Sequence, residues 1–239
     1  MSTDIDIVFS INVHEKVNFL IRQLENIKCF VKSKYVVVIN SNDTMFNILK
    51  NDEYIRNTDN VRIYPSYLNK RRYHGSLTKG IYQNMEYAMT HFIFKYFIVL
   101  SSRNMFYTEL NPKKYKHFIE RKPPVRIHQI NKTSWHWPSF LKTLLSQYII
   151  MNNKLFSSCA HEGLTFEYHA CKGILSFLIE HENIRENIFN WKHCVEEFAL
   201  QSICVNTDHT YYNIGNGCET NNKDDHLKEN TFVYKTIRI

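Results

Sequence analysis

Apolar runs and longer helical repeats alternate along the first half of the chain. Four runs have the length and the β-branched or aromatic composition of strands: residues 5–11 (IDIVFSI), 34–40 (KYVVVIN), 61–64 (VRIY) and 96–100 (YFIVL). Two segments carry apolar residues at helical spacing: Val17, Leu20, Ile21, Leu24 and Ile27 in one, and Leu77, Ile81, Met85, Ala88 and Phe92 in the other. The pattern therefore predicts strands that alternate with helices.

This alternation is typical of an α/β domain with a doubly wound parallel sheet. Ligands of such sheets bind in the crevice beyond the carboxyl ends of the strands. Polar residues that end or follow the predicted strands are therefore expected to meet at one edge: Ser10, Asn12, Asp43, Thr44 and the turn 101–104.

The second half of the chain is less regular. Residues 123–140 (PPVRIHQINKTSWHWPSF) are rich in aromatic residues without a period, which indicates a long loop that carries function. Two helices are predicted: 171–187, with Ile174, Leu175, Leu178 and Ile179 on the buried face, and 194–206, with Val195, Phe198, Ala199 and Ile203 on it. Glu196 and Glu197 fall in the first turn of the latter helix. Residues 206–226 predict a mobile surface loop, and 231–239 a last strand.

Composition limits the class of protein. The chain has 239 residues, of which 44% are hydrophobic, so it can bury one sizeable core. Its six cysteines form no C-x-x-C pair, which predicts free thiols in a reducing compartment. The formal charge of +7 favours phosphorylated or polyanionic ligands but also serves solubility. The sequence shows no leader and no apolar run of membrane-spanning length, so we expect a cytoplasmic protein.

Several familiar sites are excluded by spacing. His161 and Glu162 are not followed by the second histidine of H-E-x-x-H, and no glycine pattern forms a phosphate-binding loop. The aromatic stretch Trp135, His136 and Trp137 can stack on sugars or bases, or fill a core. The basic turn at 70–72 can meet phosphate or simply be solvated. Arg103 follows a strand directly, so its guanidinium is a candidate partner for a diphosphate.

Four segments occur in a notable order: FSINVH (9–14), VVVINSND (36–43), YFIVLSSRNMFY (96–107) and VEEFALQSI (195–203). In that order they resemble the SxxVH, HxD, YxINLSGxDxPL and PDExxxxT motifs of the core-2/I-branching N-acetylglucosaminyltransferases and their xylosyltransferase relatives. The resemblance spans about residues 5–205. It implies one GT-A domain with a mixed sheet flanked by helices. About 1–110 would bind the nucleotide sugar, and about 111–239 would bind the acceptor and carry catalysis.

The resemblance also implies residue roles. Glu197 corresponds to the glutamate of PDE, the base that deprotonates the acceptor hydroxyl. Basic residues near the carboxyl terminus neutralise the donor diphosphate in that family, so no metal is required, although the interpretation leaves room for Mn²⁺ or Mg²⁺. The donor-binding residues expected are Ser10, Val13, Asp43, Arg103, Lys235 and Arg238, and the acceptor-binding residues are Trp135, His136, Trp137 and Glu162.

The chain departs from the family pattern at three points. Asn104 replaces an aspartate, so no carboxylate stands between Ser101 and Asn104, while Val195 and Glu196 replace the proline and aspartate of PDE. The sequence therefore predicts an inverting glycosyltransferase that uses a nucleotide sugar, such as a UDP-sugar, and a glycan or glycoprotein acceptor. It would be a small relative of the kind encoded by microbes or large DNA viruses. Two alternatives stay open: a basic nucleic-acid-binding protein, and an inactive carbohydrate-binding descendant.

Overall fold

The computed structural model describes residues 4–13, 16–70, 74–111, 113–116, 137–219 and 232–235. The strands are β1 (Asp4–Val13), β2 (Tyr35–Ser41), β3 (Val61–Ile63), β4 (Ile93–Ser101), β5 (Asn104–Phe106), β6 (Leu164–Glu167), β7 (Tyr211–Asn213), β8 (Gly215–Glu219) and β9 (Val233–Lys235). The helices are α1 (Val17–Phe30), α2 (Asp43–Asn51), α3 (Glu53–Arg56), α4 (Ser76–His91), α6 (Trp137–Phe140), α7 (Leu144–Met151), α8 (Tyr168–Glu180), α9 (Glu182–Phe189) and α10 (Ala199–Asn206), with a 3-10 turn η1 (Val195–Glu197).

A six-stranded mixed sheet forms the centre of the molecule, in the order β3-β2-β1-β4-β6-β7. The first four strands are parallel, as their apolar runs predict, whereas β6 is antiparallel to both β4 and β7. A second sheet has the order β5-β9-β8. The chain moves outward from β1 to β3 and returns to β4 on the other side of β1. This reversal places the switch point, and the expected ligand crevice, at the carboxyl ends of β1 and β4.

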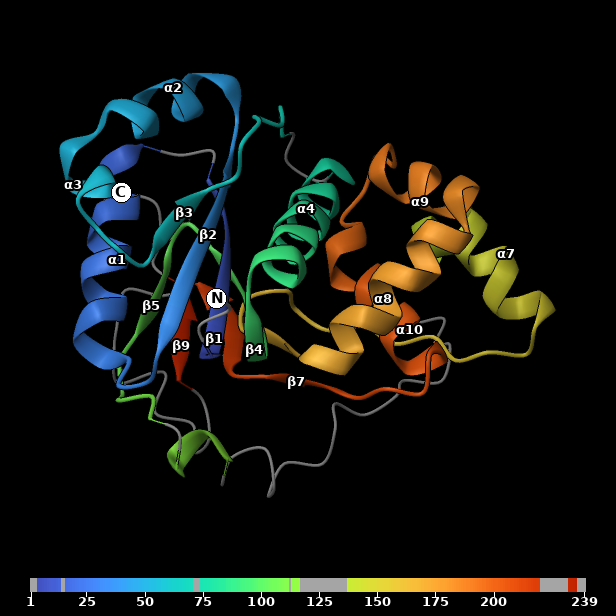
Figure 1. Ribbon diagram of the computed structural model, residues 1–239. Helices are drawn as coiled ribbons and strands as arrows, with labels where there is room; N and C mark the ends of the chain where they lie inside the picture. The colour runs from blue at the N-terminus through green and yellow to red at the C-terminus, as the bar shows by residue number, and fades with distance from the viewer. Residues whose placement is uncertain are drawn as a thin grey trace.

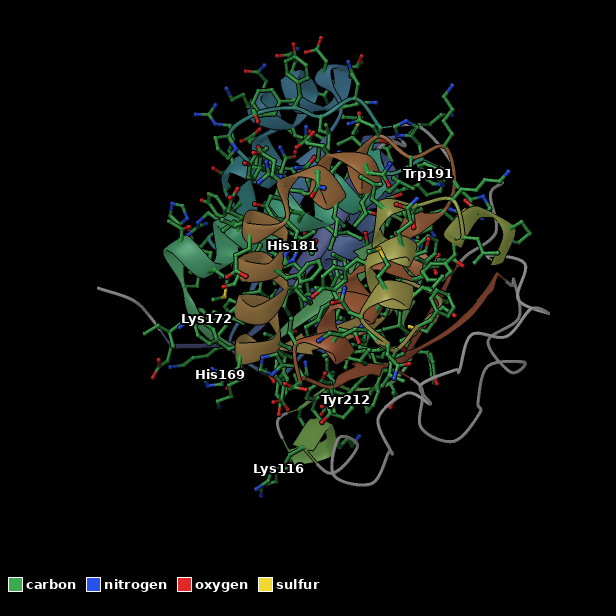
Figure 2. All side chains as sticks on the ribbon, turned by 90° about the vertical axis from the view of Figure 1, so that its right-hand side faces the viewer. Lys116, His169, Lys172, His181, Trp191 and Tyr212 are labelled. Carbon is green, nitrogen blue, oxygen red and sulfur yellow. The ribbon has the colours of Figure 1, made fainter. Side chains whose placement is uncertain are left out.

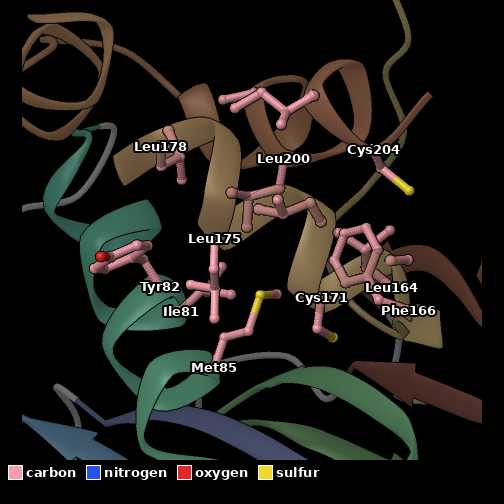
Figure 3. Close-up of a cluster of buried hydrophobic side chains, with 14 of the residues drawn as sticks. Ile81, Tyr82, Met85, Leu164, Phe166, Cys171, Leu175, Leu178, Leu200 and Cys204 are labelled. Carbon is pink, nitrogen blue, oxygen red and sulfur yellow. The ribbon is translucent and has the colours of Figure 1, made fainter. Parts of the chain in front are cut away.

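Two hydrophobic layers cover the two faces of the sheet. Alternate residues of β1 point to opposite faces, so Val8 packs with α4 and α8 while Phe9 packs with α1. Figure 1 shows α1, α2 and α3 on one side of the sheet and α4, α8, α9 and α10 on the other. Figure 3 shows Ile81, Tyr82 and Met85 of α4 facing Leu175 of α8. The sheet is therefore buried on both faces, and its loops at the strand ends are left to carry function.

Three expectations from the sequence are corrected. Asp43 and Thr44, which the sequence predicts to meet the other strand ends at the sheet edge, instead begin α2, because Asn42 caps this helix by accepting a hydrogen bond from the Met45 N–H at 2.9 Å. Ile179 is 60% exposed, because α8 ends at Glu180 and its buried face carries Ile174, Leu175 and Leu178 instead. The segment 206–226 is not one irregular loop, since it contributes β7 and β8 to the two sheets.

One expectation is confirmed, and one finding bears on another. The described cysteine side chains, those of Cys29, Cys159, Cys171, Cys194 and Cys204, are free thiols. Within the described part of the chain, no helix combines the length and apolar character needed to cross a membrane.

The packing of α4 against α8 predicts a large difference between two methionines. Met85 is fully buried in this layer, whereas Met151 is 83% exposed. Met85→Ala should lower the free energy of unfolding by about 2 to 5 kcal/mol, because it leaves a cavity. Met151→Ala should change it by no more than about 0.5 kcal/mol. Urea unfolding followed by circular dichroism measures both, and equal effects would contradict the described packing.

Candidate active site

The carboxyl ends of β1 and β4 lie side by side, with Asn12 paired in register with Ser101. The Asn12 amide donates to the Leu77 carbonyl at 2.9 Å and so ties the end of β1 to the first turn of α4. Of the residues that the sequence places at this edge, Asn12 and Ser101 therefore lie side by side, and the amino end of α4 joins them.

The turn after β4 is braced from the opposite face of the sheet. Asn104 closes it by accepting the Ser101 N–H at 2.6 Å. The Gln23 amide of α1 donates to the carbonyls of Ser101, at 2.7 Å, and Asn104, at 2.9 Å. Asn104, which replaces the aspartate of the family motif, thus has a structural role here. Arg103 within this turn is only 5% exposed, so it offers a small surface to a ligand.

The second sheet brings the end of the described chain to the same turn. Strand β9 pairs antiparallel with β5, and Lys235 stands opposite Asn104. The backbone of Lys235 is therefore adjacent to the turn that holds Arg103, and the resemblance assigns both residues to the donor. The side chain of Lys235 and the whole of Arg238 lie outside the described residues.

Glu197 does not occupy the first turn of an α-helix, which corrects the sequence prediction. Residues Val195–Glu197 form the 3-10 turn η1, and Phe198 interrupts the helical backbone with φ −143° and ψ −26° before α10 begins at Ala199. The two glutamates consequently differ in environment. Glu196 is 3% exposed, while the Glu197 side chain is 22% exposed. A shared interaction with a helix dipole therefore does not explain why two glutamates occur at these positions.

Backbone and amide hydrogen bonds fix η1 against the segment that precedes β6. The Cys159 N–H donates to the Glu197 carbonyl at 3.0 Å. The fully buried Gln201 amide donates to the carbonyls of Glu196, at 3.0 Å, and Cys159, at 3.2 Å. One direct backbone bond and the bridging Gln201 amide thus hold the two segments together, so their side chains have a defined relative position.

His161 and Glu162 are brought to the carboxyl end of β4 by this segment. The Gly163 N–H donates to the Val99 carbonyl at 2.8 Å. His161 Nδ1 lies 3.6 Å from Glu162 Oε2 and 4.0 Å from Glu197 Oε1. The sequence predicts roles for Glu162 and Glu197 but not for His161, because the spacing around this histidine only excludes a metalloprotease site. The position of His161 next to Glu162 was the available signal.

Burial dominates the electrostatics of this cluster. Loss of hydration raises the pKa of Glu196 to about 7, the nearby His161 and a backbone hydrogen bond oppose the rise, and Glu197 and Glu162 add to it. One group of three side chains in the described part of the chain, His161, Glu196 and Glu197, has potential metal-ligating atoms within 4.8 Å of one another.

Lys70 adds a cation to the same edge of the sheet. Its ammonium donates to Asn40 Oδ1 at 2.6 Å, at the carboxyl end of β2. A Cβ on Gly80 of α4 would lie 3.0 Å from Lys70 Cε and would collide with the Asn12 side chain. Burial lowers the pKa of Lys70 to about 7. In the sequence Lys70 is one member of a basic turn, and only its packing distinguishes it.

The remaining predicted residues are not all brought together. Ser10 is fully buried and accepts a hydrogen bond from the Asn84 amide at 2.9 Å, and Val13 is fully buried at the end of β1. Neither side chain offers surface to a ligand, so we leave both out of the proposed site.

The other predicted residues lie elsewhere. Asp43 is exposed at the start of α2. Trp135 and His136 lie outside the described residues, as does the side chain of Trp137, whose backbone begins α6.

A surface pocket of about 600 Å³ lies beside α6. Its lining residues are Pro138, Ser139, Lys142, Asn190, Trp191, Lys192 and His193. The Trp191 indole donates to Ser139 Oγ at 2.8 Å, and the Trp191 carbonyl accepts the N–H of Gly75, which precedes α4. Figure 2 shows Trp191 in the upper part of the view and Lys116 at the bottom. The pocket therefore lies at the amino end of α4, and His193 leads into η1.

No protein-family model matches the sequence, and a search of the curated proteins finds no match.

The lowered pKa of Lys70 predicts a pH-dependent contribution to stability. The folded-state pKa is about 7 and the ordinary value 10.5, so between these values the unfolded chain binds more protons than the folded chain. The cost of burying the charged Lys70 ammonium is therefore complete below about pH 7, and it decreases as the pH rises towards 10.5. Relative to Lys70→Met, the wild-type free energy of unfolding should rise by about 1 to 3 kcal/mol, less than the full shift implies because part of the side chain is exposed.

Urea unfolding at about pH 6, 8 and 10 measures this difference. Lys172→Met, which removes an exposed lysine of α8, is the control and should differ from the wild type by the same amount at each pH. A pH-independent difference for Lys70→Met would show that Lys70 is hydrated in the folded state.

Proposed function

We propose that this chain is an inverting glycosyltransferase of the GT-A type, which moves a sugar from a nucleotide-sugar donor, such as a UDP-sugar, to a glycan acceptor. Glu197 is the general base. The observation that carries the proposal is the position of Glu197, whose partly exposed carboxylate lies 4.0 Å from His161 near the carboxyl end of β4. Ligands of doubly wound sheets bind at this edge.

A general base must reach the proton that it accepts, within about 3 Å of the acceptor oxygen. Glu197 meets the condition of access, since its side chain is 22% exposed, and Glu196 does not, since it is 3% exposed. The bonds from Cys159 and Gln201 hold this part of the backbone in place. A fixed carboxylate beside open surface suits proton abstraction from a bound hydroxyl.

The reaction is a single displacement. The acceptor oxygen attacks the anomeric carbon of the donor sugar while its proton passes to the Glu197 carboxylate. The bond from the anomeric carbon to the diphosphate oxygen breaks, and its electron pair leaves with the nucleoside diphosphate. Attack from the face opposite the leaving group inverts the anomeric centre.

The cations at this edge suit the departing diphosphate. Arg103 and the backbone of Lys235 meet at the turn after β4, and Lys70 lies at the end of β2. A diphosphate near Lys70 would favour the charged ammonium and raise its pKa again. A guanidinium and an ammonium can thus stabilise the negative charge that develops on the leaving group.

The pocket beside α6 suits the acceptor. Trp191 and Pro138 supply apolar faces of the kind that pack against sugar C–H groups, and Ser139 and Asn190 supply hydrogen-bonding groups. His193, which lines this pocket, is followed in the sequence by Cys194 and η1. A lining residue of the pocket and the proposed base Glu197 are therefore only four positions apart in the chain.

Glu197→Gln tests the base, because the change keeps the shape of the side chain but removes its ability to accept a proton. Turnover of UDP-glucose, UDP-xylose or UDP-N-acetylglucosamine in EDTA, measured as UDP release with glycan acceptors, should fall by about 10² to 10⁴. UDP affinity should stay within about twofold of the wild type.

Glu180→Gln, at an exposed position of α8, is the matched control and should keep full turnover. Glu196→Gln is unsuitable for this purpose, since Glu196 is buried in the cluster. Equal turnover in the Glu197 and Glu180 variants would refute the catalytic role.

Metal removal tests the donor site separately. UDP should raise the thermal unfolding temperature by the same amount in EDTA as in Mn²⁺, because the turn after β4 offers a guanidinium and no carboxylate. UDP at a hundredfold its dissociation constant should add about 2.7 kcal/mol to stability. Each shift is measured against the same buffer without UDP, so that stabilisation by Mn²⁺ itself is subtracted. A shift that EDTA abolishes would require a metal-bound diphosphate.

A further inference from the structure

Three carboxylates surround one imidazole near the carboxyl end of β4. His161 Nδ1 lies 3.6 Å from Glu162 Oε2 and 4.0 Å from Glu197 Oε1. Ligating atoms of His161, Glu196 and Glu197 all lie within 4.8 Å of one another. Glu162 and Glu196 are 4% and 3% exposed, so bulk water screens their charges weakly. Weak screening by water strengthens the attraction between these carboxylates and any cation that binds among them.

Two atoms of the cluster lack a hydrogen-bond partner among the described residues. They are Glu196 Oε2 and His161 Nδ1, both buried. Buried polar atoms are rarely left unpaired, and an ion or a water is a common reason when they are. Glu196 is the more informative of the two. Its carboxylate is only 3% exposed, so Oε2 loses its hydration, and no described donor replaces the lost water.

We propose that His161, Glu196 and Glu197 bind a divalent transition-metal ion of the Zn²⁺ class. Ligands about 2.1 Å from a tetrahedral zinc are about 3.4 Å apart. The 4.0 Å between His161 Nδ1 and Glu197 Oε1 therefore has to contract by roughly 0.6 Å on metal binding, and a separation at the 4.8 Å limit of the cluster by roughly 1.4 Å. The partial exposure of Glu197 and His161, 22% and 18%, leaves one side of the ion open to water.

The donor set selects the class of metal. An imidazole nitrogen with two carboxylates suits Zn²⁺ and its transition-metal neighbours, whereas Mg²⁺ and Ca²⁺ prefer all-oxygen sites. Two ionised carboxylates also balance the charge of a divalent ion. The hydrogen bonds from Cys159 and Gln201 hold the two ligand-bearing segments together before any ion binds. Preorganised ligands reduce the ordering that binding requires.

Metal binding, measured without any sugar substrate, tests this site independently of the proposed function. The full chain is treated with EDTA, dialysed and titrated with Zn²⁺ by calorimetry. The wild type should bind one Zn²⁺ at this site. His161→Gln, Glu196→Gln and Glu197→Gln should each weaken that binding at least about tenfold, since even outer-shell changes at metal sites cost that much. His91→Gln and Glu180→Gln, both at exposed positions, should bind as the wild type does.

Two further measurements keep the outcome decisive. Thermal unfolding in EDTA checks that each variant is folded, and the partly exposed position of Glu197 makes its variant informative if Glu196→Gln unfolds. The visible spectrum of the Co²⁺-loaded wild type reports ligands without any substitution, and thiolate charge-transfer bands would assign the ion to a cysteine and overturn the proposal. Unchanged Zn²⁺ affinity in the folded variants, or no binding by the wild type, would also overturn it and leave protons to neutralise the cluster.

Discussion

The backbone at Gly163 determines where the candidate site lies. Its φ of +81° is a conformation that residues with a side chain rarely adopt, and a Cβ there would collide with the Gly215 backbone. Its N–H donates to Val99 of β4, and its carbonyl accepts the N–H of Ile214 at 3.0 Å. This one residue therefore joins the central sheet, the chain that leads into β8, and the loop that carries His161 and Glu162.

Two buried glutamines extend this constraint to the rest of the edge. Gln23 joins the two carbonyls of the turn after β4, and Gln201 joins those of Cys159 and Glu196. Both side chains are fully buried, so their amide hydrogen bonds are protected from competition by water. The edge is thus built from irregular backbone whose polar groups are satisfied by side chains of α1 and α10. Such a frame can hold carboxylates at positions that would otherwise be unfavourable.

The carboxylate cluster is costly to the folded state, which supports a functional interpretation. Burial and the neighbouring acids raise the pKa of Glu196 to about 7, so its ionised form is disfavoured near neutral pH. A hydrophobic residue would pack in its place without that penalty. Departures from locally favourable chemistry concentrate at functional sites. The proposed base and the proposed metal site both use the Glu197 carboxylate. In the first proposal this carboxylate accepts a proton, and in the second it binds an ion.

The sequence by itself determined the sheet and the helices that cover it. Continuous apolar runs predict parallel strands buried on both faces, and the spacing of Ile81, Met85 and Ala88 predicts α4, because periodicity is a local property of the chain. The order of four motifs also selected Glu197. Only the tertiary structure decided that Glu196 is buried beside His161, that Ser10 and Val13 lie inside the sheet, and that Lys235 meets the turn after β4. These contacts depend on the antiparallel return of β6 and on the pairing of β9 with β5. Segments far apart in the chain carry no local signal of the partner that they will meet, so their contacts are fixed only when the sheets close.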